Sequence, residues 1–222
     1  MISLIYTRLY RHQKQTFEFS WNVTHHEKVL DNSIGKVLHI FLNDVYLGNI
    51  PEDIFNNPSV TRASAFILKG ISKTKANVLQ KKLEIRELVR IRKTQLTTLA
   101  KDVTSRLGKP SKSTILKYIL IKNDDALATR VPLWSYNKKI VGHLDLLLFN
   151  PNINTINVSI FLQEGNYVRY IPVVAIYGDL LSELLKVDKE HVECIIFKTD
   201  AEWVFSLPDY EKIKSLLPSF SP

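Results

Sequence analysis

Alternating apolar and polar positions predict a β-rich start to the chain. Residues 2–6 and 17–21 carry apolar side chains at every second position, the period of a strand with one buried face. Residues 37–42 form a nearly continuous apolar run, which favours a further strand. Asn43 and Asp44 follow with typical turn chemistry. The pattern therefore predicts a β-rich N-terminal extension over residues 1–57.

The middle of the chain has a helical pattern. From residue 74 to 107, apolar positions recur mainly at steps of three and four residues, as expected for a helix with one buried face. Gly108 and Pro110 then stop the pattern. We expect one long helix over residues 74–107, followed by a short helix capped by Ser111 or Ser113.

Strands and helices alternate in the last third. Apolar runs predict strands, and amphipathic stretches predict helices. The expected strands span residues 126–134, 140–149, 155–163, 192–197 and 203–205, and the expected helices span 170–186 and 209–217. This order predicts an α/β (α+β) domain over residues 58–222, with a mixed sheet flanked by helices.

Positive charge is concentrated in the predicted helical region. The formal net charge is +8, yet residues 71–123 alone hold fourteen Lys and Arg against Glu84, Glu87 and Asp102, a local net charge of +11. The remaining residues therefore carry −3. A basic element beside a near-neutral body favours a polyanionic partner, although a merely solvated helix face has the same composition. The candidate nucleic-acid-binding side chains here are Arg86, Arg90, Lys93 and Lys101.

Several protein classes are disfavoured. Cys194 is the only cysteine, so neither an internal disulfide nor a cysteine-based zinc site is expected. No apolar run approaches the length of a membrane span, and the N-terminus lacks the pattern of a signal peptide. We expect a cytoplasmic protein with no membrane partner.

The strongest chemical feature is a carboxylate within an apolar strand. Asp145 lies in the run Gly-His-Leu-Asp-Leu-Leu-Leu from Gly142. A carboxylate buried there needs a metal or another partner. Backbone amides or a cation such as Arg130 or Arg169 would also satisfy it. His143 lies two residues away on the same face of the strand, where it could contact a phosphate or a metal-bound water.

The region from Ala126 to Phe205 resembles the PD-(D/E)XK nuclease superfamily, most closely its RecB-like archaeal branch, which includes Holliday-junction resolvases. The resemblance rests on Gly-His-Leu-Asp, then a turn, a strand ending in Glu164-Gly165-Asn166, and a helix that begins near Arg169 and contains Tyr177. Nuclease-fold proteins of spindle-shaped archaeal viruses are faintly similar. The resemblance implies metal-assisted phosphodiester hydrolysis with Mg²⁺ or Mn²⁺, DNA as substrate, and a homodimer.

Two signature positions depart from that family. The alignment places Ile160 where the second acid belongs and Leu162 where the lysine belongs. Neither side chain can bind a metal or activate water. The hydrolytic site has either been lost or has moved, with Gln163 and Glu164 as catalytic substitutes beside Asp145. Metal ligands would then be Asp145, Glu164 and Glu87, although Glu87 could equally pair with Arg90. Arg169 and Tyr177 would contact nucleic acid.

Two functions consequently stay open. The first is a metal-dependent DNA nuclease, either general or structure-specific, with an atypical active site. The second is an inactive nuclease-fold module that binds DNA. Residues 1–57 match no motif, and could form a subdomain, a dimer element or a wall of the DNA groove.

Overall fold

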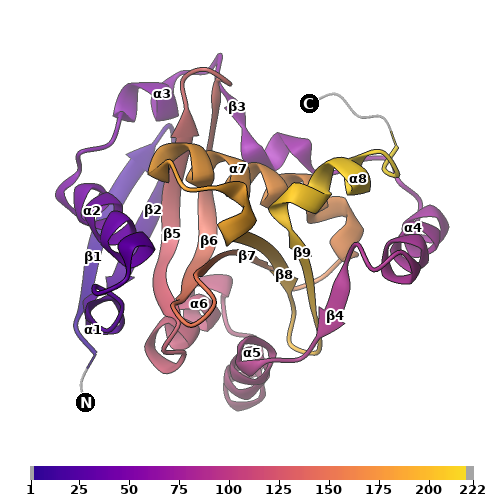
Figure 1. Ribbon diagram of the computed structural model, residues 1–222, viewed down its shortest axis with the longest axis horizontal. Helices are drawn as coiled ribbons and strands as arrows, with labels where there is room; N and C mark the ends of the chain where they lie inside the picture. The colour runs from indigo at the N-terminus through magenta and orange to yellow at the C-terminus, as the bar shows by residue number, and fades with distance from the viewer. Residues whose placement is uncertain (1–2, 219–222) are drawn as a thin grey trace.

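The computed structural model describes residues 3–218, in which nine strands form one sheet (Figure 1). The order is β1-β2-β5-β6-β7-β8-β9-β4, and β3 pairs in parallel with β6. Most neighbours are antiparallel, and β7 and β8 are parallel. The strands are β1 (Ile5–His12), β2 (Gln15–Asn22), β3 (Thr61–Arg62), β4 (Arg90–Arg92), β5 (Ala126–Ser135), β6 (Ile140–Asn150), β7 (Thr155–Phe161), β8 (Val192–Phe197) and β9 (Glu202–Ser206).

Helices cover both faces of this sheet and connect its strands (Figure 1). The α-helices are α1 (Val23–Glu27), α2 (Ser33–Leu47), α3 (Glu52–Asn56), α4 (Lys73–Ile85), α5 (Gln95–Leu107), α6 (Lys112–Lys122), α7 (Ile171–Leu185) and α8 (Tyr210–Lys214). Short 3₁₀ turns are η1 (Ala63–Phe66), η2 (Tyr167–Tyr170), η3 (Lys189–His191) and η4 (Leu207–Asp209). The predicted mixed α/β class is confirmed.

Two apolar clusters hold the layers together. The larger packs α2, α4 and α7 against the sheet, and its members include Leu38, Leu83 and Leu181. The smaller packs α5 and α6 against strand residues such as Phe161 and Phe197. Helix α7 crosses between the parallel strands β7 and β8, as the alternating pattern of the last third predicts. None of the helices within residues 3–218 has the length and apolar character needed to cross a bilayer.

The N-terminal segment is only partly β. Strands β1 and β2 agree with the period-two pattern, and β2 joins the main sheet by pairing with β5. The predicted strand at residues 37–42 is wrong, because this run lies within α2. The Asn32 side chain caps α2, and Gly48 ends it with a left-handed φ of 86°. The helix buries Leu38, Leu42 and Val45 along one face.

The predicted long helix over residues 74–107 is also wrong. Helix α4 ends at Ile85, and Glu87 has a left-handed φ of 56° that a helix cannot accommodate. Residues Arg90–Arg92 then pair with β9 as an edge strand. Thr94 caps the second helix, α5, which Gly108 ends as expected. The basic residues of this region therefore lie on three elements rather than on one.

Candidate functional site

Asp145 lies on β6 at the centre of the candidate site, and its side chain is 5% exposed. Three groups hold it. Arg130 Nη1 lies 3.3 Å from Oδ1, Lys112 Nζ lies 2.5 Å from Oδ2, and the Phe161 backbone N–H donates to Oδ2 at 3.0 Å. The sequence left open a carboxylate capped by a backbone amide and a cation, and the structure contains that arrangement. Arg169, the other cation considered, instead donates to the Ile71 carbonyl.

Arg130 and Asp145 are cross-strand neighbours. Val131 pairs with Leu144 and Thr129 pairs with Leu146, which leaves these two charged residues opposite each other on β5 and β6. Arg130 has a φ of 55°, in the left-handed region. Leu144 packs in the larger apolar cluster, whereas Leu146 packs in the smaller one. The strand is therefore irregular at this pair, where a charged pair interrupts an otherwise apolar ladder.

A pocket of about 860 Å³ opens beside Asp145. The β1–β2 turn supplies part of its wall through His12, Gln13, Lys14 and Gln15. Residues between Asn56 and Ile67, including Arg62, supply another part. Residues 12–15 and 56 thus place part of the N-terminal segment in the wall of this pocket, whereas a wall of a DNA groove, a subdomain or a dimer element stays a prediction.

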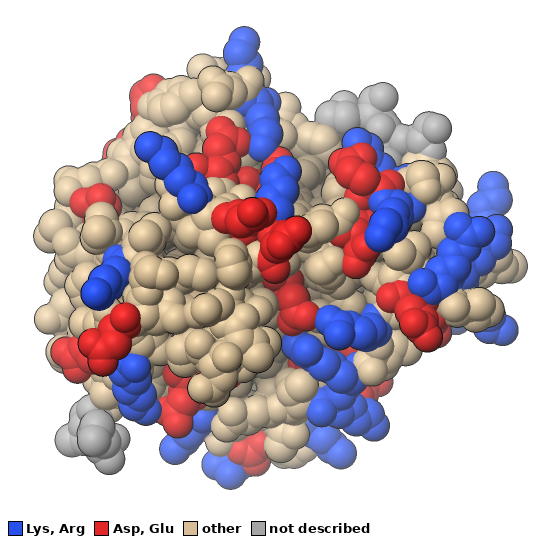
Figure 2. All heavy atoms as spheres, in the orientation of Figure 1, with Lys and Arg blue, Asp and Glu red and all other residues tan. Residues whose placement is uncertain are grey.

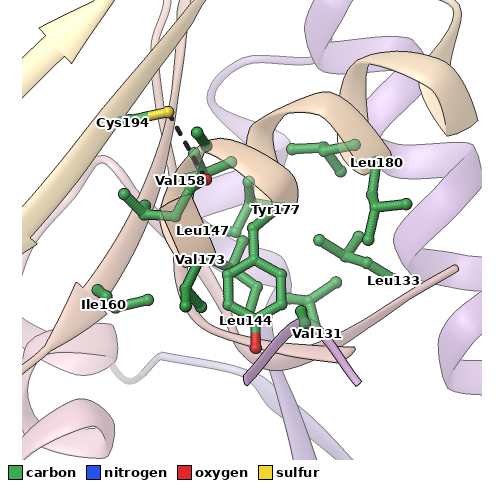
Figure 3. Close-up of a cluster of buried hydrophobic side chains, with 14 of the residues drawn as sticks. Val131, Leu133, Leu144, Leu147, Val158, Ile160, Val173, Tyr177, Leu180 and Cys194 are labelled. Carbon is green, nitrogen blue, oxygen red and sulfur yellow. Dashed lines mark hydrogen bonds between the residues drawn. The ribbon is translucent and has the colours of Figure 1, made fainter. Parts of the chain in front are cut away.

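Ile160 and Leu162 line the same pocket as Asp145 and are buried. Both belong to the larger apolar cluster, whereas Phe161 between them faces the smaller one. The predicted alternation of these side chains is confirmed. Figure 3 shows Ile160 and Val173 next to Tyr177 among the apolar side chains. The positions where the family resemblance places an acid and a lysine therefore form an apolar floor.

His143 and His12 form a buried pair in this pocket. His12 Nδ1 and His143 Nε2 lie 2.8 Å apart, and His143 stacks on Phe17 with ring centroids 3.7 Å apart. Burial, together with smaller contributions from nearby arginines, lowers the pKa of His12 to about 4 and that of His143 to about 2. Both rings are thus neutral at pH 7, so one nitrogen of the pair donates and the other accepts.

Tyr177 extends from α7 to the edge of the pocket. Its ring explains Gly142, because a Cβ at this glycine would lie 2.5 Å from Tyr177 Cε1. Burial raises the pKa of the Tyr177 hydroxyl well above its usual value, and the charge of Asp145 adds to the shift. At neutral pH the hydroxyl is protonated, and can donate a hydrogen bond.

The proposed catalytic substitutes lie elsewhere. Gln163 and Glu164 are exposed and do not line the pocket. Gln163 Nε2 instead donates to the Pro110 carbonyl at 3.4 Å. Glu87 is exposed beyond the end of α4, and Arg90 pairs with Glu193 at 2.7 Å rather than with Glu87. The structure therefore does not bring Glu164 or Glu87 to the Asp145 pocket.

The residues of the pocket do not fit Mg²⁺ or Mn²⁺. Both ions prefer oxygen ligands, and need at least one carboxylate whose oxygens are free to coordinate them. Among the lining residues that the structure describes, Asp145 is the only acid, and both its oxygens already accept from Lys112, Arg130 or Phe161. Nowhere in residues 3–218 do three or more His, Cys, Asp or Glu side chains form a group that could hold a metal.

The basic side chains form a separate surface, here called the basic surface, on α4, β4 and α5. Figure 2 shows Lys and Arg gathered over α4 and, below it, around β4 and α5. Arg86, Lys93 and Lys101 are exposed, and none of them lines the Asp145 pocket. Arg169 lies beside a second pocket of about 510 Å³, which Lys73 of α4, Lys198 and Trp203 also line.

No sequence pattern marks four of the pocket residues: His12, Lys14, Arg62 and Lys112. Each is distant along the chain from Asp145 and lies in no recognisable motif. Lys112 is the first residue of the helix that Ser111 caps. The cap therefore predicts where the helix begins, but not which residue Lys112 contacts. A pairing of this kind is fixed by the tertiary fold and has no local signal.

No protein-family model matches the chain, and no curated protein is significantly similar to it.

Proposed function

We propose that this chain is a DNA-binding protein of the PD-(D/E)XK nuclease type whose pocket has lost phosphodiester hydrolysis. The observation that carries the proposal is the environment of Asp145, where Lys112 and Arg130 stand in place of a metal. Ile160 and Leu162 occupy the positions of the second acid and the lysine. This proposal adopts the second of the two functions that the sequence left open.

The order of elements supports the nuclease-type fold. Asp145 lies on β6, between the antiparallel strands β5 and β7. The next strand along the chain, β7, contains Ile160, and Leu162 directly follows its end. Helix α7, with Tyr177, comes next, as in the family arrangement. Asp145, Ile160, Leu162 and Tyr177 all line one pocket, which supports the proposed fold.

The chemistry of the pocket supports loss of hydrolysis. Metal-assisted hydrolysis needs a cation that polarises the phosphate and prepares the attacking water. Lys112 is a lysine near Asp145, but it comes from α6, and its ammonium group already pairs with that carboxylate. A protonated, paired ammonium is a poor proton acceptor. It can instead hold a phosphate oxygen without cleaving the ester.

The basic surface supports the choice of DNA as partner. Within residues 71–123, all Lys and Arg except Arg92 and Lys112 are exposed. Lys81, Lys82, Arg86, Lys93 and Lys101 form no ion pair within the described part of the chain. Unpaired cations on one surface neutralise phosphates, and release the counterions that surround the nucleic acid. The homodimer implied by the family resemblance stays a prediction.

The salt dependence of duplex binding tests this proposal. We expect the logarithm of the association constant to fall linearly with the logarithm of salt concentration, with a slope of roughly −3 to −6 for a surface of this size. Fluorescence anisotropy with a labelled duplex measures it. A salt-independent association constant, or no binding at low salt, would show that the basic surface is only solvated.

A further inference from the structure

The pocket beside Asp145 has a strongly basic lining. Lys14, Arg62, Lys112 and Arg130 line it, against the single acid Asp145. The described lining therefore has a net charge of +3, since His12 and His143 are neutral at pH 7. Charges in a partly enclosed pocket interact more strongly than charges on an open surface, because less water screens them. The pocket is thus suited to an anion.

His12 adds a buried polar group without a partner. Its side chain is 1% exposed, and Nδ1 is engaged with His143. Nε2 has no hydrogen-bond partner among residues 3–218. When His143 Nε2–H donates to His12 Nδ1, His12 Nε2 carries a proton and needs an acceptor. An oxygen of a bound anion that enters between the β1–β2 turn and β6 would supply it.

The remaining lining suits a nucleoside rather than a bare ion. Ile160, Leu162 and Val173 give an apolar floor, and Tyr170 and Phe17 add aromatic rings. Aromatic and apolar side chains can pack against a base or a sugar. A volume of about 860 Å³ lies within the range of about 300–1,000 Å³ that is usual for small-ligand sites. One nucleotide therefore matches the pocket in both size and character.

We propose that this pocket binds the phosphorylated end of a DNA strand, with Lys14, Arg62, Lys112 and Arg130 around a terminal phosphomonoester. The inference rests on the proposed DNA-binding function and deepens it. A terminal monoester carries a charge close to −2 at neutral pH, whereas an internal diester carries −1. A pocket with a net charge of +3 favours the more charged group. The β1–β2 turn closes one side, which suits a strand end.

The test compares duplexes of identical sequence that end in a 5′-phosphate, a 3′-phosphate or only hydroxyl groups. Competition anisotropy at physiological ionic strength gives the affinity of each for the full chain. We expect one phosphorylated end to bind about tenfold more tightly than the hydroxyl form, because the added phosphomonoester brings a charge close to −2 to the pocket. Equal affinities for all three duplexes would overturn the inference. If all three duplexes still bound, the proposed DNA-binding function would be unaffected.

Variants locate the preference. Lys14→Gln combined with Lys112→Gln should remove the preference for the phosphorylated end, so that the affinities for the phosphorylated and hydroxyl duplexes lie within about twofold of each other. Lys101→Gln, on the basic surface, should weaken both duplexes equally and retain the preference. Retention of the preference in the double variant, with its circular dichroism unchanged, would place the terminal phosphate elsewhere.

A free nucleotide is the other source of a phosphomonoester. An unlabelled nucleoside monophosphate should compete only at concentrations about a hundredfold above those of the phosphorylated duplex, because it makes no contact with the basic surface. Competition at equal concentrations would show that the pocket binds free nucleotides, and would overturn the assignment to a strand end.

Discussion

The Asp145 pocket and the basic surface are both cationic, but their charges act in different settings. In the pocket, the buried Asp145 carboxylate forms ion pairs with two cations, and burial keeps the neighbouring histidines neutral. On α4, β4 and α5, most cations are exposed and several lack a partner within the described residues. Charges in the pocket are thus coupled to folding. Charges on the surface are screened by salt and are free to bind.

The largest effect is expected on the basic surface. Replacement of Arg86, Lys93 and Lys101 by Gln removes three exposed cations. Affinity for duplex DNA at low salt should fall about a hundredfold or more, and the magnitude of the salt slope should decrease by roughly 2–3. The unfolding free energy should change by less than about 1 kcal/mol. Anisotropy titrations and urea unfolding measure the two quantities.

A matched control separates location from total charge. The exposed residues Lys36, Lys139 and Lys186 belong to α2, the β5–β6 turn and the end of α7, not to α4, β4 or α5. Their replacement by Gln lowers the net charge by the same amount. If this control weakens DNA binding as much as the first variant does, the affinity depends on overall charge and not on the basic surface.

The histidine pair should make folding sensitive to acid. The pKa values of His12 and His143 in the folded state, about 4 and about 2, lie below the ordinary value of 6.5. The unfolded chain therefore binds more protons than the folded chain below pH 6.5, so the unfolding free energy falls as pH drops from about 6.5 toward 4. We expect a loss of about 1 kcal/mol per pH unit for each histidine.

The double variant His12→Phe/His143→Leu tests this coupling. Urea unfolding at a series of pH values between 7 and 5 should give a shallower dependence on pH than in the wild-type protein. His191→Gln, outside the pocket, serves as the control. An unchanged slope in the double variant would mean that the pair does not control the acid response.

Arg130 tests whether the ion cluster supports the fold. Arg130→Asn leaves Asp145 buried with only Lys112 as a cationic partner, and Asn tolerates the left-handed φ of 55° at this position. We expect the unfolding free energy to fall by about 2 kcal/mol, since the removal of one partner leaves a buried charge poorly compensated. Arg130→Lys should restore part of this loss. A loss below about 0.5 kcal/mol would contradict a structural role.

The smallest effect is expected at Glu164. This side chain is exposed and lies outside the pocket, so Glu164→Ala should leave DNA affinity within about twofold and stability within about 0.5 kcal/mol. If the wild-type protein has metal-dependent activity that this variant loses, the alternative of a hydrolytic site that has moved to Glu164 would be supported.

The sequence predicted the last third of the fold well because long apolar runs with clear turns mark strands such as β6 and β7. It failed at residues 37–42, since a short apolar run is compatible with either a buried helix or a strand. It also failed at residues 74–107, because the helical period continues weakly across a break set by Glu87 and the pairing of β4 with β9. Both errors arise where tertiary contacts outweigh local pattern.

Within the site, Asp145 was predictable because a carboxylate in an apolar strand is rare and costly. Arg130, on the neighbouring strand, was one of the cations that the sequence analysis considered as a partner of Asp145. The pairing with Lys112 was not predictable, because the docking of α6 against the sheet determines it. The same holds for His12 and Lys14, which the β1–β2 turn brings to the pocket.

We propose above that Lys112 and Arg130, and not a metal ion, neutralise the Asp145 carboxylate. The direct test measures duplex binding and cleavage by the wild-type protein and by Asp145→Asn, each in Mg²⁺ and in EDTA. We expect no cleavage, a wild-type affinity that is no higher in Mg²⁺ than in EDTA because Mg²⁺ competes for the phosphates, and an Asp145→Asn affinity equal to or higher than that of the wild type, because the pocket gains net positive charge. Mg²⁺-dependent cleavage or binding that Asp145→Asn abolishes would contradict this proposal.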